Sequence, residues 1–467
     1  MNRSAADPSG SAPAPSPDVE NRLSRPAPVR FGEALRFWIK LGFISFGGPA
    51  GQIAILHAEL VERRRWIGER RFLHALNYCM VLPGPEAQQL ATYLGWLMHR
   101  TWGGIAAGAL FVLPSLLILI GLSWIYCAFG DVPQIAGVFH GIKPAVSAIV
   151  VQAAQRIGAR TLRNPALWGI AGASFGAIFA LDLPFPAIVA AAAGIGALGG
   201  RYAPRWFQTG AGHGQAGHSC GPALIDDDTP TPDHARFQWR RLALVLGCGA
   251  LLWGLPLAGL AWIYGWSGTL TQMGWFFTKA ALLTFGGAYA VLPYVYQGAV
   301  EHFHWLTAPQ MMDGLALGET TPGPLIMVVA FVGFLGGYFQ ALFGPGLPFL
   351  AGAAAANVVT WFTFLPSFLF ILAGGPLVES THQEIRLTAP LTAITAAVVG
   401  VIGNLALFFA YHVLWPQGLT GAFDWGSACL AGAAAVALLR YKVGVIPVVL
   451  ACGAAGLAMV FLARGLT

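Results

Sequence analysis

The sequence predicts an all-α polytopic membrane protein built from two inverted-topology repeats with broken, re-entrant helices, joined by an extra transmembrane helix. The first observation is composition: 56% of the 467 residues are hydrophobic and only 10% are charged, whereas soluble globular proteins carry about 25% charged residues. The second observation is that one segment recurs in both halves of the chain. The third is that each copy interrupts its apolar sequence twice with glycine and proline.

Residues 1–30 are rich in Ser, Ala and Pro and lack the apolar stretch of a signal peptide. They are predicted to form a disordered cytoplasmic tail. The six cysteines are scattered and contain no Cys-X-X-Cys pair. We interpret them as small apolar residues rather than as a disulfide framework.

Several apolar runs approach or reach the ~20 residues that a membrane-spanning helix needs. The shorter ones require flanking residues to complete a crossing. The runs are residues 105–128, 166–181, 188–200, 242–264, 391–411, 428–439 and 443–462. The net charge of +6 is spread over several basic loops, so it indicates orientation in the membrane, and no nucleic-acid partner is predicted.

A first repeat is predicted at residues 31–200 and a second at 268–464. Aligning Phe37 with Phe276 gives an offset of 239 residues, which holds without a gap for 49 positions. A lysine, a glutamate, a tryptophan and two Gly/Pro breaks recur at this fixed spacing, which chance similarity between apolar segments does not explain. Further on, FVLPSLLILI at 111–120 echoes TFLPSFLFIL at 363–372. The two halves are therefore predicted to be a duplication.

Residues 201–241 separate the repeats and are polar and rich in Gly and Pro, so a cytoplasmic linker is predicted. Its His213, His218 and Cys220 match no standard metal spacing, and no metal is assigned. Residues 242–264 have no counterpart in the first repeat and form the predicted connecting transmembrane helix.

The arginines are distributed unequally between the repeats. Residues 61–71 contain five, the equivalent residues 300–310 contain none, and residues 155–163 of the first repeat are again basic. Because positive loops stay in the cytoplasm, the repeats are predicted to lie upside down relative to each other, as in many secondary transporters. The inner (plasma) membrane is the predicted location, with the N-terminus cytoplasmic and the C-terminus periplasmic.

Each repeat contains two predicted breaks. In the first repeat, arms at 31–46 and 49–63 flank a Gly-Gly-Pro turn, and at 1.5 Å per residue each arm reaches only ~23 Å of the ~30 Å membrane core. A re-entrant hairpin explains this length. A Pro-Gly-Pro break then separates an amphipathic arm at 68–81 from a helix that begins at Glu86, and the second repeat has both breaks at matching positions.

Irregular backbone at membrane depth is tolerated only where it lines a cavity or is buried in protein. A helix that restarts there points free N–H groups and the positive end of its dipole inward, which favours an anion. The alternative is that Gly and Pro merely permit close helix packing. We predict an anion site formed by Phe46, Gly47, Gly48, Gln52, Pro83, Gly84, Pro85, Gln88, Gly286, Gly287, Thr320, Thr321, Pro322, Gly323 and Pro324.

Charged residues within the apolar arms extend this prediction. Lys40 and Lys279 occupy matching positions, and a lysine in the membrane interior costs ~2.5–3.5 kcal/mol on insertion scales. We expect both to flank a bound dianion; the alternative is that they extend to the membrane surface. Glu86 and Glu319 lie beside the Pro-Gly-Pro breaks and are predicted coupling residues. Glu86 could simply be a first-turn acid favoured by the helix dipole, so Glu319 is the better proton carrier.

Four segments carry a resemblance to a known family: FGGPAGQ (46–52), LPGPEAQQLATYLGW (82–96), FGGAYAVLPY (285–294) and LGETTPGPLI (317–326). The sequence resembles the chromate ion transporter family in its long, two-domain form, over roughly residues 31–200 and 268–464. The resemblance implies export of chromate and chromate resistance, with sulfate or another oxyanion as the alternative substrate. Chromate and sulfate are both tetrahedral dianions, which the residues alone do not separate.

The sequence lacks the motifs that other classes of membrane protein would contain. A membrane-embedded enzyme such as a reductase would need a flavin, haem or metal motif, so we predict no enzyme activity and no cofactor. The sequence has no ATP-binding motif, so protons or the membrane potential are the predicted driving force. A homodimer is one option for its assembly.

Overall fold

The predicted helical membrane protein is confirmed. The computed structural model describes residues 25–130, 132–207, 222–226, 228–230, 232–380 and 388–465; the tail before residue 25 and the candidate metal residues His213, His218 and Cys220 lie outside this part. Within the described residues the chain is helical apart from connecting segments and one isolated β-bridge. Seven of these helices are long and apolar enough to cross a membrane.

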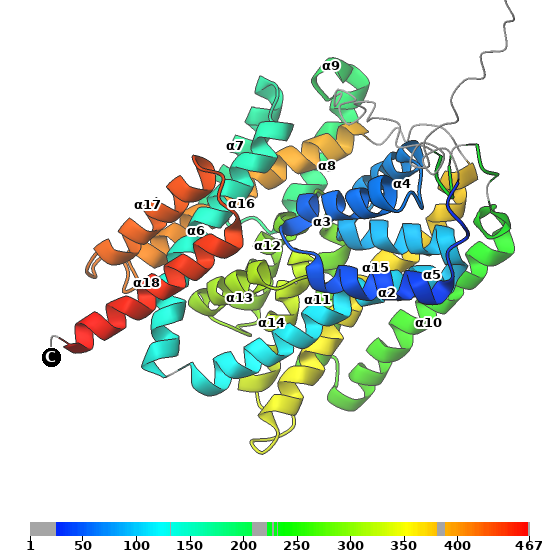
Figure 1. The fold of residues 1–467 in the computed structure, drawn as a ribbon. Coiled ribbons are helices and arrows are strands. Elements are labelled where there is room, and N and C mark those ends of the chain that lie inside the picture. Colours follow the sequence, from blue (N-terminus) through cyan, green and yellow to red (C-terminus); the bar gives the residue numbers. More distant parts are fainter. Residues whose placement is uncertain are drawn as a thin grey trace, which may run out of the picture.

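The two repeats follow the same order of elements (Figure 1). The first contains α2 (Phe31–Ile44), α3 (Gly48–His57), the π-helical turn η1 (Ala58–Arg63), α4 (Glu69–Val81), α5 (Glu86–Phe129), α6 (Pro133–Thr161), α7 (Pro165–Leu181) and α8 (Phe185–Tyr202). The segment between the repeats contains α9 (Pro204–Phe207), η2 (Asp233–Ala235) and α10 (Trp239–Tyr264). The second repeat contains α11 (Thr269–Leu283), α12 (Ala288–Tyr296), η3 (Gln297–His302), α13 (Ala308–Thr320), η4 (Leu325–Met327), α14 (Val328–Phe339), α15 (Pro348–Ser380), α16 (Thr388–Leu414), α17 (Trp425–Leu439) and α18 (Val445–Gly465).

The duplication extends to the local backbone. The π-helical turns η1 and η3 and the helices α4 and α13 begin and end at positions that keep the offset of 239 residues. The same offset relates Arg65, with φ of 51°, to His304, with φ of 52°. Positive φ is uncommon for residues other than glycine. Matching exceptions therefore indicate that both copies fold in the same local way.

The first two helices of each repeat form a hairpin that is closed by aromatic residues. The rings of Phe37 and Trp66 lie 5.4 Å apart in the first repeat, and those of Phe276 and Trp305 lie 5.7 Å apart in the second. These contacts bring the chain after the π-helical turn back beside the first helix. The shared Phe and Trp thus fix the same fold-back in both copies.

Helix α5 is itself a tight hairpin. Non-helical angles at His99 and Arg100, where φ is −135° and 57°, separate a first arm at 86–98 from a second arm at 101–129. Glycine lets the arms approach closely, since a Cβ on Gly104 would come within 2.9 Å of the carbonyl oxygen of Thr92. The first arm corresponds to η4 and α14 of the second repeat, and the second arm corresponds to α15.

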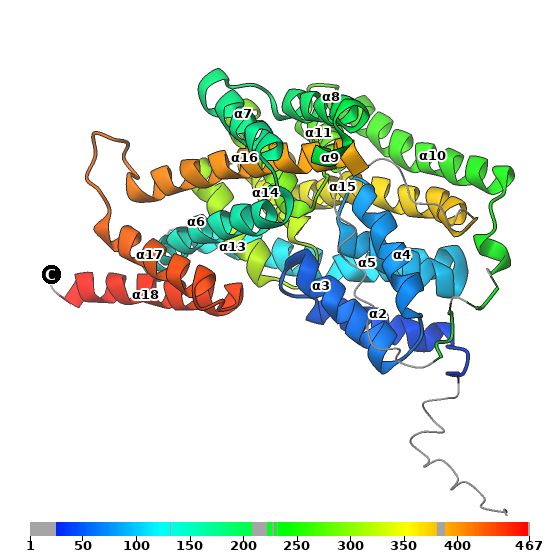
Figure 2. The ribbon, with the colours of Figure 1, turned by 90° about the horizontal axis from the view of Figure 1, so that it is seen from above.

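The repeats exchange their last helices. Helices α17 and α18 pack against α6, whereas α7 and α8 pack against α16 (Figure 2). The second arm of α5 runs antiparallel to α15, because Gly108 lies against Phe368 while Trp124 lies 5.9 Å from Phe349. This one pair of equivalent helices thus runs in opposite directions, as the predicted inversion requires. The inversion of the whole repeats stays a prediction.

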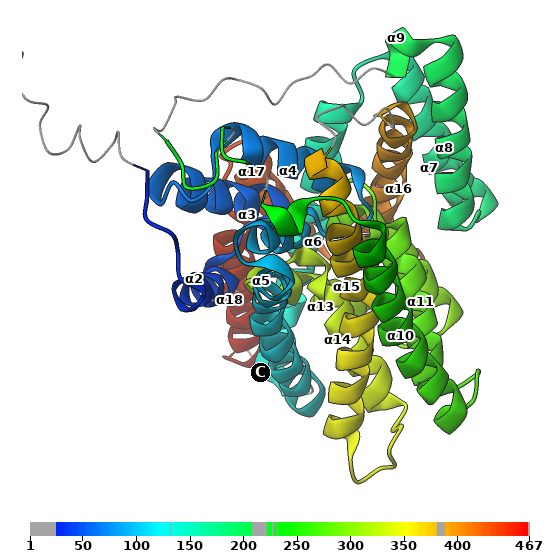
Figure 3. The ribbon, with the colours of Figure 1, turned by 90° about the vertical axis from the view of Figure 1, so that its right-hand side faces the viewer.

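The connecting helix α10 lies along the outer edge of the molecule beside α11 and α15 (Figure 3). Only Gly249 and Leu257 of this helix are buried, as expected for a helix whose apolar surface faces lipid. The linker before it is bound to the first repeat. Ile225 pairs with Ile67 in a β-bridge, and the Arg71 guanidinium donates to the backbone oxygen of Asp226 at 2.9 Å.

Candidate functional site

The four predicted breaks are joined in two pairs across the repeats. The Gly84 N–H donates to the carbonyl oxygen of Thr284 at 2.7 Å, and the Gly323 N–H donates to the carbonyl oxygen of Ser45 at 2.8 Å. Gly84 and Gly323 are equivalent positions, as are Ser45 and Thr284. Each Pro-Gly-Pro break is therefore bonded to the end of the other repeat's first helix. Such a reciprocal contact is the hallmark of a two-fold relation.

Both Pro-Gly-Pro breaks need glycine. The φ angles of Gly84 and Gly323 are 126° and 108°, which side-chain-bearing residues rarely adopt. Gly84 also lies against the hydroxyl of Ser367, and a Cβ on Gly323 would lie 2.7 Å from the Cβ of Ser115. The two serines belong to the segments at 111–120 and 363–372 that echo each other in sequence. The breaks are therefore tightly packed against the opposite repeat.

At the Gly-Gly breaks, the second glycine of each pair has open space beside its Cα. Helix α3 begins at Gly48 and α12 begins directly after Gly287, and no side chain caps either helix start. No atom lies within 4 Å of the position that a Cβ on Gly48 or Gly287 would occupy. The first N–H groups of a helix have no intrahelical partner. Two equivalent helix starts thus offer donors next to open space.

The two hairpin tips are placed asymmetrically. Helix α12 packs against α16, and Gly287 and Ala288 are buried. Helix α3 makes no comparable contact with α6 among the described residues, and Gly47 and Ala50 are exposed. The second hairpin is thus docked on α16 of its own repeat, whereas the first, in the described part of the chain, has no comparable contact with the equivalent helix α6.

Three buried glutamines lie at the breaks, and one of them, Gln52, joins a break of each repeat. Gln52 donates from Nε2 to the carbonyl oxygens of Ser45, at 3.3 Å, and Gly323. Gln88 donates to the Thr92 hydroxyl at 3.0 Å. Gln89, which was not among the predicted site residues, donates to the Pro83 carbonyl oxygen at 2.8 Å. The Oε1 atoms of Gln88 and Gln89 are buried without a hydrogen-bond partner among the described residues.

The predicted coupling acids lie beside the breaks. The Tyr289 hydroxyl, in the first turn of α12, donates to Glu319 at the end of α13. Arg156 acts electrostatically on Glu319, and Arg160 acts on Glu86 in the first turn of α5. Both arginines are exposed residues of α6. The sequence showed them only as part of a basic segment, because nothing in it indicated which side chains they face.

The predicted threonines are satisfied within their own helix. The Thr320 hydroxyl donates to the Ala316 carbonyl oxygen at 3.1 Å, and the Thr321 hydroxyl donates to the Gly318 carbonyl oxygen at 3.2 Å. Their hydroxyl protons are thus already engaged. Phe46 is half-buried next to Gly47.

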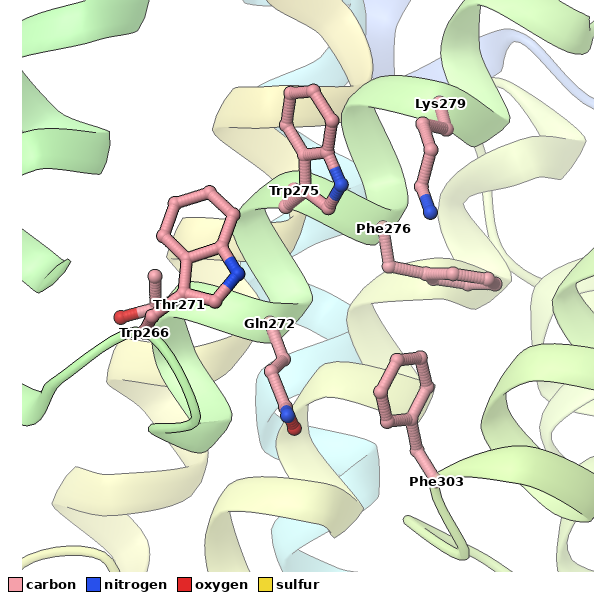
Figure 4. A pocket seen from close by; sticks show the side chains of 7 residues that line it. All are labelled: Trp266, Thr271, Gln272, Trp275, Phe276, Lys279 and Phe303. Atoms are coloured by element: carbon pink, nitrogen blue, oxygen red, sulfur yellow. The ribbon is translucent and has the colours of Figure 1, made fainter.

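The structure does not bring the two predicted lysines to the breaks. Lys40 and Lys279 are both exposed on the outer faces of α2 and α11. The Lys279 Nζ lies 5.8 Å from the centre of the Trp275 ring. It lines a surface pocket with aromatic residues of the same hairpin (Figure 4): Trp266, Trp275, Phe276 and Phe303. These positions fit side chains that extend to the membrane surface.

Helices that are broken within a multi-pass helical membrane protein are typical of transporters. Such breaks occur where backbone lines an ion or substrate path, as in many transporters. The chain belongs to the chromate transporter family. The family model described as "Chromate transporter" matches residues 32–197 and 271–457, which cover most of both repeats. The resemblance seen in the break segments is thereby confirmed.

Three named relatives align along most of the chain. It is 34% identical to a chromate transport protein of Pseudomonas aeruginosa, over 92% of this chain and 93% of that one. It is 29% identical to a chromate transport protein of Cupriavidus metallidurans, over 88% of each. It is also 29% identical to a probable chromate transport protein of Synechococcus elongatus, over 79% of this chain and 82% of that one. No solved structure matches the chain.

Proposed function

We propose that this protein is a secondary transporter that exports chromate from the cytoplasm across the inner membrane and so confers chromate resistance. The observation that carries this proposal is the pair of uncapped helix starts at Gly48 and Gly287 in a family named for chromate transport. Backbone N–H groups at a helix start are natural donors to an oxyanion. Sulfate, or another tetrahedral oxyanion, is the alternative substrate because it presents similar acceptor oxygens.

The substrate site in this proposal comprises the four breaks and the buried glutamines beside them. Arg156 and Arg160 form its cationic entrance, because they are exposed and act on the acids beside the breaks. Lys40 and Lys279 contribute to it only in a conformation that turns them inward. Lys40→Gln and Lys279→Gln decide this point: chromate flux falls if the lysines bind the anion and stays unchanged if they only reach the membrane surface.

The inverted arrangement of the repeats in the membrane is part of the proposal. It is supported by the arginine asymmetry, by the reciprocal bonds between breaks and by the antiparallel packing of α5 on α15. The two hairpins then enter the membrane from opposite sides. Exchange of the docked and undocked hairpins would alternate access to the site, which is how inverted repeats commonly work.

Energy for export is available from the membrane potential. Moving two negative charges out of a cell at 100 mV, negative inside, releases ~4.6 kcal/mol, at ~2.3 kcal/mol per charge. Entry of one proton for each chromate exported would add the pH gradient. In our proposal Glu319 carries that proton, since it ends α13 beside the break and is bonded by Tyr289.

The test is chromate flux in vesicles that contain only the purified protein. Radioactive chromate should move under an imposed voltage, and sulfate should compete if it shares the site. Absence of flux of either anion under voltage and under a pH gradient would overturn transport. Reduction of chromate by the protein alone would instead establish the enzyme alternative.

Two variants separate coupling from transport. Glu319→Gln should abolish the response of flux to a pH gradient and keep voltage-driven flux. Glu301→Gln is the matched control, because Glu301 lies in η3 away from the breaks and is exposed. Full pH dependence in Glu319→Gln would make that residue structural and favour voltage-driven export.

A further inference from the structure

A second acid of α13 is more deeply buried than Glu319. The side chain of Asp313 is 2% exposed. The Tyr126 hydroxyl donates to its Oδ2 at 2.9 Å, and the Lys143 Nζ lies 3.6 Å from the same oxygen. The Oδ1 atom is buried and has no hydrogen-bond partner among the described residues. Asp313 is thus a buried carboxyl with both partners on one oxygen and a free acceptor on the other.

This geometry is poorly suited to a purely structural ion pair. Buried ion pairs offset the loss of water only when additional hydrogen bonds satisfy their remaining lone pairs. Ionisable residues inside a membrane protein commonly mark proton relays and ion paths. A proton on Oδ1 would remove the charge and occupy the unpaired oxygen. The Asp313 site therefore fits a group that binds and releases a proton.

Among the described residues, the ionisable groups in contact with Asp313 are Lys143 and Tyr126. Both come from the first repeat, on α6 and α5. One turn before Lys143, His140 lies 3.5 Å from Asp424 at the start of α17. Helix α14 and η4 contain no Asp, Glu, His, Lys or Arg. On α16, His412 bonds to the Phe408 carbonyl oxygen of its own helix.

Asp313 and Glu319 are arranged in series along one pair of helices. They lie six residues apart on α13, which packs against α6. Lys143, in the first half of α6, faces Asp313, whereas Arg156, near the end of α6, acts on Glu319. Each acid thus has its own cation from the same helix. At 1.5 Å per residue, the two acids are ~9 Å apart along the axis of α13.

We propose that Asp313 is a proton-binding site that works in series with Glu319, and that Lys143 holds it ionised between turnovers. A proton from water on one side binds Oδ1 when Lys143 moves away, and it leaves to the other side when Lys143 returns. No other bond changes. This inference rests on the proposed transport of an oxyanion and names the second group through which that transport is coupled.

The test measures proton and chromate movement together, in vesicles that hold the full-length protein and an internal pH indicator. The variant carries Lys143→Met and Asp313→Asn together, because removing one partner alone would leave an uncompensated buried charge. We expect it to keep voltage-driven chromate flux and to lose the proton movement that chromate drives. The matched control removes an exposed linker pair through Arg236→Met and Asp233→Asn and should keep both.

Each result has a separate meaning. The Asp313 site is overturned if the variant moves as many protons per chromate as the parent protein does. It is also overturned if the parent protein moves chromate without protons. The proposed transport of chromate stands in both cases. A parent protein that moves no chromate overturns the proposed function instead. If the variant does not fold, carbodiimide labelling of Asp313 in the parent protein decides. A hydrophobic carbodiimide, which reacts with protonated buried carboxyls, should label Asp313 more at low pH and less with chromate, and labelling that ignores both overturns the site.

Discussion

Replacing Gly323 by alanine should destabilise the protein more than the same replacement at Gly287. The φ angles of the two glycines are 108° and 99°, so both variants force an alanine into backbone that favours glycine. That strain costs ~1–3 kcal/mol at each position. Only at Gly323 does the new Cβ also meet an atom, the Cβ of Ser115 at 2.7 Å. Overpacking of this kind adds ~1–3 kcal/mol, which is the expected difference between the variants.

The contact with Ser115 can be removed without changing the strained backbone. In a Ser115→Gly background, Gly323→Ala should cost no more than Gly287→Ala does in the parent chain. Ser115→Gly itself costs ~0.5 kcal/mol in helix propensity, so the single variant Ser115→Gly is the reference for the double variant. The free energy of unfolding is measured in mixed micelles through tryptophan fluorescence as the denaturing detergent fraction rises. Equal costs for the two alanine variants, or no relief in the Ser115→Gly background, would refute the packing of this break against the opposite repeat.

Three further predictions concern the periphery of the site. Arg71→Met removes the 2.7 Å contact of that guanidinium with the buried Glu379 carboxylate. In the same unfolding assay it should lower the free energy of unfolding by ~3–5 kcal/mol, because the carboxylate is left buried without its partner. The double variant Arg71→Met, Glu379→Gln should recover part of this loss. Asp424→Ala should cost ~0.5–2 kcal/mol as a lost helix cap. Burial raises the pKa of Asp424, but hydrogen bonds from the first turn of α17 outweigh it and hold the pKa below its usual range. The stabilisation that ionised Asp424 gives to the folded state is therefore present above its pKa in the unfolded chain, and it is lost as pH falls through its lower pKa in the folded protein. The alanine variant should lose this part of the decrease in stability at acid pH. Cysteines placed beside Arg65 and beside His304 should react with membrane-impermeant reagents from the cytoplasm and from outside, respectively, and labelling of both from one side would contradict the inverted repeats.

The sequence predicted the breaks well because glycine and proline are local signals. Gly47, Gly84 and their counterparts in the second repeat all have the positive φ that glycine adopts readily in turns. Their fixed offset in the sequence indicated the duplication. The π-helical turns and the hairpin within α5 were not predicted. The turn of that hairpin falls at His99 and Arg100, where neither residue is a turn former. What makes the turn is the close approach of glycines on the two arms, which is a tertiary contact.

The lysine prediction shows the difference between depth and direction. Lys40 lies within α2, four residues before its last residue, as predicted. The buried face of this helix is formed by Phe37, Trp38 and Leu41, so Lys40 is on the outer side. The position of apolar neighbours along the helix contained this information. Asp313 had no comparable signal, because its partner Lys143 is distant in sequence and in the other repeat.

The exchange of end helices has a consequence for biosynthesis. Helix α6 enters the membrane early in translation, but the helices that cover it, α17 and α18, are the last to be made. Until the ribosome finishes, the first half therefore presents small-residue surface, such as Gly137 and Gly141, that only Gly456 and its neighbours will cover. A nascent chain must be held in this open form for the whole of elongation. Chains that terminate before α17 should accordingly be recognised and removed by membrane proteases, and full-length protein should accumulate only when both halves are inserted together.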